Sequence, residues 1–159
     1  MIVTIFEERD RESLFPLNQI RASFELRCGA FTNLERIENL LSPDDTVQLV
    51  VRDELVPLVQ ERFPNIAINP DFLSRGIWLN GAGLWTEKIL KNLTSGKSYT
   101  KNGIVIAMYN NDAIPLSDFH LYLTKANLVS TEGKSRRALR MRSITASSFS
   151  LMTPSFSTT

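Results

Sequence analysis

Two arginines and a helix start lie close together near the beginning of the sequence. Arg21 and Arg27 are spaced along a polar stretch, which follows the apolar run Ile2–Phe6 and leads to Thr32. One guanidinium group can donate two parallel hydrogen bonds to the oxygens of a phosphate, and the first N–H groups of a helix favour an anion. The pattern therefore suggests a phosphate site, although a first β–α unit with solvated arginines on its loop would look the same.

The helix start itself has a recognisable signature. Thr32 and Glu35 have the spacing of a capping box, in which the two side chains bond to each other's backbone N–H groups. Leu34, Ile37 and Leu41 then fall on one face of the helix. We therefore expect a helix to begin at Thr32.

The rest of the chain alternates between apolar runs and helical patterns. Such alternation predicts a three-layer, Rossmann-like α/β fold with a mainly parallel sheet. The expected strands are Ile2–Phe6, Thr46–Val51, Ala67–Asn69, Ile77–Asn80 and Ile104–Tyr109, and the expected helices are Thr32–Leu41, Asp53–Phe63, Thr86–Leu93 and Ser117–Asn127. Ligands of such sheets bind beyond the carboxyl ends of the strands. The loop after Phe6 and the segment Asn80-Gly81 are expected at that edge.

Composition points to one ordinary domain. The chain has 159 residues, of which 43% are hydrophobic and 22% charged, and its net charge of +1 indicates no nucleic-acid partner. No stretch approaches the roughly 18 apolar residues of a membrane span, and the first apolar run is too short for a signal peptide. The single cysteine excludes an internal disulfide. We expect a cytoplasmic protein without a membrane partner.

The end of the chain differs from the rest. Residues 1–129 carry 13 basic and 16 acidic side chains, whereas residues 130–159 carry 5 basic and 1 acidic. Ten of the last 17 residues are Ser or Thr, and no apolar period is present. This segment could be a basic tail for an anionic partner or a phosphorylation segment. We favour a third interpretation, a truncated or frame-shifted end of a longer chain, with the domain at 1–129.

Several short motifs resemble those of a known family. Pro16-Leu17, Arg21, Gly29 and Leu34-Glu35-Arg36 stand in the order seen at the start of sugar-1-phosphate nucleotidyltransferases. The run Phe24–Gly29 and the later Asn80-Gly81 are similar to a divergent bacterial branch related to N-acetylglucosamine-1-phosphate uridylyltransferase. The resemblance covers about residues 1–128, so the chain would hold the N-terminal portion of an incomplete domain.

The resemblance implies a reaction and its participants. A sugar-1-phosphate would attack the α-phosphorus of a nucleoside triphosphate and release pyrophosphate, with Mg²⁺ as the cofactor. Arg11 and Arg21 would be catalytic, and five further residues would bind substrate: Arg27, Gly29, Thr32, Asn80 and Gly81. The metal ligands, the base and the sugar stay open, as does a homo-oligomeric state.

The sequence also departs from the family pattern. The glycine-rich G-x-G-T-R loop is missing, because its last three positions fall on Arg11, Glu12 and Ser13. Ser23 stands where the family carries a lysine. These groups normally cradle the triphosphate, so the chain could be inactive. The alternative function is a non-enzymatic binding or assembly module that keeps the fold without the triphosphate loop.

Overall fold

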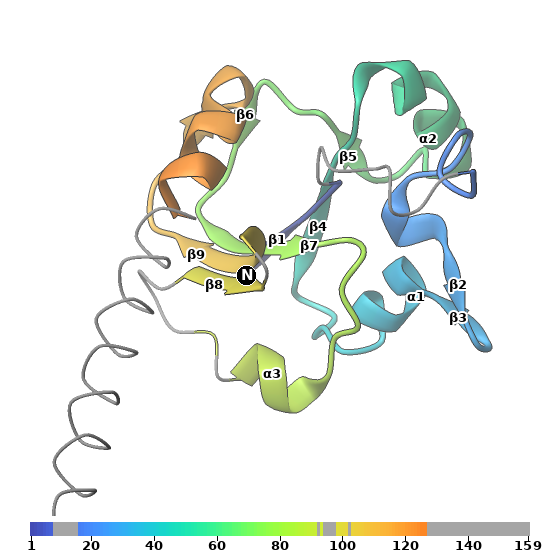
Figure 1. Cartoon of the computed structure of the whole chain (residues 1–159), viewed down its shortest axis with the longest axis horizontal. Coiled ribbons are helices and arrows are strands. Elements are labelled where there is room, and N and C mark those ends of the chain that lie inside the picture. The colour runs from blue at the N-terminus through green and yellow to red at the C-terminus, as the bar shows by residue number, and fades with distance from the viewer. Residues whose placement is uncertain (8–15, 92, 94–97, 102, 127–159) are drawn as a thin grey trace, which may run out of the picture.

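The computed structural model describes residues 1–7, 16–91, 93, 98–101 and 103–126, and it contains a central six-stranded sheet (Figure 1). Four neighbouring strands run parallel, the fifth strand runs antiparallel to them, and the sixth pairs antiparallel with the fifth. From edge to edge the strands are β5 (Ala67–Ile68), β4 (Thr46–Val50), β1 (Ile2–Phe6), β7 (Gly76–Asn80), β9 (Ile104–Asn110) and β8 (Ser98–Lys101).

Helices α1 (Asn33–Glu38), α2 (Val56–Arg62) and α3 (Glu87–Lys91) form a layer on one face of the sheet. Alternate strand residues such as Val3, Ile5 and Leu79 point into this layer, where they meet Leu34 of α1 and Val59 of α2. The four-residue apolar spacing of the helices explains this packing, since it places one stripe of side chains against the sheet.

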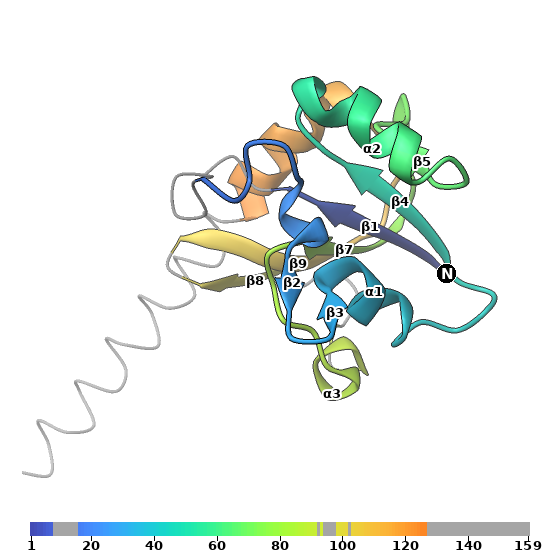
Figure 2. The ribbon, with the colours of Figure 1, turned by 90° about the vertical axis from the view of Figure 1, so that its right-hand side faces the viewer.

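A second layer covers the opposite face. It consists of the helix at 119–126, drawn in orange in Figure 1, and the short antiparallel pair β6 (Phe72–Leu73) and β10 (Ile114–Pro115). Trp78 of β7 and Phe6 of β1 are fully buried there against Phe119, with ring centroids 5.3 and 5.5 Å from it. The predicted three-layer α/β fold is therefore confirmed (Figure 2).

The expected strands and helices are all present; β1 has the predicted bounds, and the other elements have shifted ends. The helix predicted at Asp53–Phe63 consists of a 3-10 turn, η3 (Asp53–Leu55), followed by α2. The Ser117–Asn127 prediction likewise divides into the 3-10 turn η4 (Leu116–Asp118) and the helix at 119–126. Helix α1 ends three residues earlier than predicted, because Leu40 and Leu41 bond to carbonyls three residues back and tighten into a turn.

The apolar run in β9 was misleading in one respect. Its composition is typical of a parallel strand, but β9 is antiparallel to both β7 and β8. Val105 and Met108 pack into the second layer and Ala107 into the first. A strand covered on both faces is apolar in either direction, so composition does not report direction. The predicted domain boundary at 129 and the tail 130–159 lie outside the described residues.

Candidate active site

The carboxyl ends of β1, β4 and β7 meet at one edge of the sheet. The N–H of Glu7, directly after β1, donates to Val50 O at 2.9 Å, and the N–H of Gly81, directly after β7, donates to Phe6 O at 2.8 Å. Arg52 follows the same edge after β4. As predicted, Asn80 and Gly81 lie where ligands of such sheets bind.

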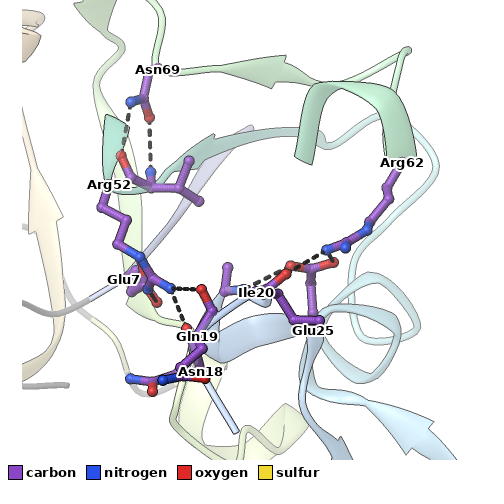
Figure 3. A network of polar contacts seen from close by, with 10 residues as sticks. Glu7, Asn18, Gln19, Ile20, Glu25, Arg52, Arg62 and Asn69 are labelled. Carbon is purple, nitrogen blue, oxygen red and sulfur yellow. Dashed lines mark hydrogen bonds and ion pairs between the residues drawn. The ribbon is translucent and has the colours of Figure 1, made fainter. Parts of the chain in front are cut away.

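Arg52 joins this edge to the loop that precedes η2, a 3-10 turn at Ser23–Glu25. Its Nη1 atom donates to Oε1 of Glu7 at 2.6 Å. Its Nη2 atom donates to the backbone oxygens of Asn18 and Gln19, the latter at 3.1 Å (Figure 3). The Glu7 side chain is 3% exposed and that of Arg52 is 14% exposed. The loop is therefore anchored by a largely buried ion pair.

A second ion pair holds the same loop from α2. Nη1 of Arg62 donates to Glu25 Oε1 at 2.7 Å and to the backbone oxygen of Ile20 at 3.2 Å (Figure 3). Oε2 of Glu25 accepts the N–H of Ala22 at 2.7 Å. The Glu25 carboxylate and the Arg62 guanidinium thus fix the backbone on both sides of residue 21.

Arg21 itself projects from this anchored backbone. Its side chain is exposed, and within the described part of the chain no hydrogen bond or ion pair engages its guanidinium. An arginine with open donors on a fixed backbone is suited to bind phosphate oxygens. The other catalytic candidate, Arg11, lies outside the described residues.

The loop, the start of α1 and the end of β7 converge on Gly81. Asn33 Nδ2 donates to Gly81 O at 3.0 Å. A Cβ at Gly81 would lie 2.8 Å from Phe24 Cβ and 3.0 Å from Ser23 Oγ, so a larger residue would displace the loop. Ser23 is 3% exposed. Glycine is therefore required here by close packing.

The side chain of Asn80 shapes the turn after β7. Its Oδ1 accepts the N–H of Ala82 at 2.9 Å, and its Nδ2 donates to Val105 O at 3.3 Å. Its backbone oxygen accepts the indole N–H of Trp85 at 3.1 Å. Asn80 is 4% exposed, so its polar groups hold the turn and the neighbouring strand together.

Arg27 and Gly29 lie on a separate feature, a small hairpin of β2 (Arg27–Cys28) and β3 (Phe31–Thr32) beside α1 (Figure 2). Nη1 of Arg27 donates to Ala30 O at 2.8 Å across the turn. Gly29 has φ +81° in the turn, a conformation that glycine adopts without strain. Both residues are exposed, and their described contacts brace the hairpin.

Thr32 caps α1 as its spacing predicted. Its Oγ1 accepts the N–H of Glu35 at 3.1 Å, and Oε2 of Glu35 accepts the N–H of Thr32 at 2.6 Å. The hydrogen bond from the Thr32 backbone lowers the pKa of Glu35 most, followed by the bond with the Thr32 side chain and the charge of Arg27. A carboxylate of this protein thus occupies the helix start on which the phosphate prediction partly rested.

The lowered pKa of Glu35 gives a pH-dependent prediction. When the pKa of a carboxyl is lower in the folded than in the unfolded protein, its charge stabilises the fold at pH values above the unfolded pKa. This stabilisation is lost as the pH falls through the folded pKa. Glu35→Gln keeps a capping oxygen but has no charge. We therefore expect wild type to exceed Glu35→Gln in urea midpoint at pH 7, and the difference should be smaller at pH 3, below the ordinary carboxyl pKa of 4.5. A difference that is the same at both pH values would contradict this role of the charge.

The sequence alone did not single out the four residues that form the two ion pairs, Arg52, Arg62, Glu7 and Glu25. The signal that could have found Arg52 and Glu7 is their position, since each directly follows an apolar strand that ends at the ligand edge. Arg62 and Glu25 give no such signal, because they lie 37 residues apart on a helix and a turn.

The described residues form no ready-made cluster of metal ligands. No three His, Cys, Asp or Glu side chains among them gather so that they could hold a metal ion. Glu7 is bound to Arg52, and Asp45 accepts from Ser42 N–H and pairs with the N-terminal ammonium, at the opposite edge of the sheet. We therefore assign no step of the reaction to a metal bound by these side chains.

None of the described helices has the length and apolar character that crossing a membrane requires.

Comparison with known proteins identifies the family of this chain. A search of curated proteins found no match. The family model described as sugar nucleotidyl transferase matches residues 3–146, which include all of the strand-end edge. The match supports a nucleotidyltransferase-type function, and the chain belongs to the sugar nucleotidyl transferase family.

Proposed function

We propose that this chain binds a nucleoside triphosphate and a sugar-1-phosphate at the carboxyl edge of β1, β4 and β7. The observation that carries the proposal is Arg21, an exposed guanidinium on a backbone that two ion pairs hold at this edge. The family match supports substrates of this class. The particular branch stays a prediction, and the base and the sugar stay open.

The proposed reaction is transfer of a nucleotidyl group. An oxygen of the sugar-1-phosphate forms a bond to the α-phosphorus, the bond between the α-phosphorus and its bridging oxygen breaks, and that electron pair leaves with pyrophosphate. Negative charge on the phosphate oxygens must be neutralised along this path, and fixed cationic donors do this without reorganisation. Arg21 would supply such donors.

The other predicted residues have supporting parts in the proposal. Arg27 would place positive charge beside the substrate from the hairpin, where Gly29 allows the turn. Asn80 and Gly81 would shape the turn that meets the base or sugar, and Thr32 would fix the start of α1 next to it. Mg²⁺ would enter with the triphosphate. In sites of this kind the metal usually keeps several waters and is otherwise bound by phosphate oxygens of the substrate and one or two carboxylates.

Nucleotide binding tests the proposal. UTP or dTTP with Mg²⁺ at about 100 Kd should stabilise the fold by about 2.7 kcal/mol, which a rise in Tm would report. Arg21→Ala should lose most of this gain. Arg75→Ala is the matched control, because Arg75 is exposed at the opposite edge, directly before β7, and should keep the gain. A wild-type Tm that does not respond to millimolar nucleotide would overturn the proposal.

Turnover separates the proposed enzyme from a binding module. The missing glycine-rich loop and the buried Ser23 at the lysine position favour the second candidate. Pyrophosphate release from UTP or dTTP with a sugar-1-phosphate would support the enzyme. Nucleotide binding without pyrophosphate release would support the module.

A further inference from the structure

We infer that Arg52 is a positioning residue, which sets the place of Arg21 by holding the loop backbone before it. The inference rests on the proposed function and adds a residue that has no direct contact with substrate.

The geometry of Arg52 is that of a clamp between the sheet edge and the loop. One guanidinium nitrogen donates to Glu7, which follows β1, and the other donates to the backbone oxygens of Asn18 and Gln19 (Figure 3). The planar fork of a guanidinium allows both nitrogens to be used at once in fixed directions. A lysine would keep the charge but lose this fork.

The loop is held at four successive places around Arg21. Arg52 fixes the oxygens of Asn18 and Gln19, Arg62 fixes the oxygen of Ile20, and Glu25 fixes the N–H of Ala22. Residue 21 stands between the last two contacts. Four anchored peptide groups leave its Cα little freedom to shift.

The cost of these contacts favours a positional role. Burying an ion pair removes both charges from water, and an apolar pair of similar volume is often as stable. The Glu7 carboxylate is 3% exposed, so this desolvation is nearly complete for one partner. Stability alone therefore does not require the pair, whereas a fixed direction for the loop does.

A double-variant cycle for nucleotide binding tests the inference. The Kd for UTP or dTTP, whichever binds wild type more tightly, is measured by calorimetry for wild type, Arg52→Lys, Arg21→Ala and the double variant, with urea midpoints to verify folding. If Arg52 acts through Arg21, Arg52→Lys should weaken binding by about tenfold in wild type and by less than about twofold in the Arg21→Ala background. Arg75→Ala serves as the control that leaves Kd unchanged.

The possible outcomes separate the positioning role of Arg52 from the proposed function. Equal losses in the two backgrounds, or no loss from Arg52→Lys, would overturn the positioning role while the proposed function stands. A wild type that binds neither UTP nor dTTP would overturn the proposed function and this inference together. If Arg52→Lys does not fold, Arg62→Lys tests the same coupling from the second anchor, whose side chain is 32% exposed and better able to tolerate the change.

Discussion

Gly76→Ala is expected to destabilise the fold by about 3–5 kcal/mol, because the new Cβ has no space and the backbone is unsuited to it. Gly76 begins β7 with φ +150°, and a Cβ there would lie 2.1 Å from the backbone oxygen of Ile2. This oxygen belongs to β1, which pairs with β7 along its length. The collision can be relieved only by separating the two central strands.

The matched controls are Gly29→Ala and Gly103→Ala. These glycines have φ +81° and +79°, and a Cβ at either would meet nothing within 4 Å. They should lose about 1–2 kcal/mol from backbone strain alone. Urea denaturation at pH 7 measures all three variants. If Gly76→Ala loses no more than the controls, the close approach of β1 and β7 would be contradicted.

The central strands could be predicted because each is a run of mostly apolar residues. β1 matches its predicted bounds, and β4 and β7 match within one residue. β6, β10 and the β2–β3 hairpin were missed, because each strand has only two residues and two residues have no period. The edge strand β8 was missed as well, because its four residues are mostly polar and form no apolar run. Their position depends on contacts with distant parts of the chain.

The candidate site was predictable only where its bonds are local. The Thr32–Glu35 capping box spans three residues, so its spacing is visible in the sequence. The Arg52–Glu7 pair spans 45 residues, and before folding Arg52 resembles any solvated arginine. The sequence reasoning thus singled out Arg21 but not the residues that hold its loop. Long-range ion pairs become recognisable only once the strand order places their partners at one edge.

The second ion pair of the loop gives the other large effect. Glu25→Ala is expected to destabilise the fold by about 3 kcal/mol, the lower end for breaking a buried pair, because Arg62 is about one-third exposed and partly screened. The loss has two sources. Arg62 loses its partner, and the N–H of Ala22, a residue with 0% exposure, loses its acceptor.

Two controls divide these sources. Glu25→Gln keeps an oxygen for the Ala22 N–H but removes the charge, so its loss of stability should be smaller than that of Glu25→Ala. Glu87→Ala removes one partner of the exposed Lys91–Glu87 pair, whose side chains are 73% and 67% exposed, and should change stability far less than Glu25→Ala does. The free energies of unfolding come from urea titrations at pH 7. Similar losses for Glu25→Ala and Glu87→Ala would show that the buried pair contributes no more than a surface pair, and that the loop carrying Arg21 is held by other contacts.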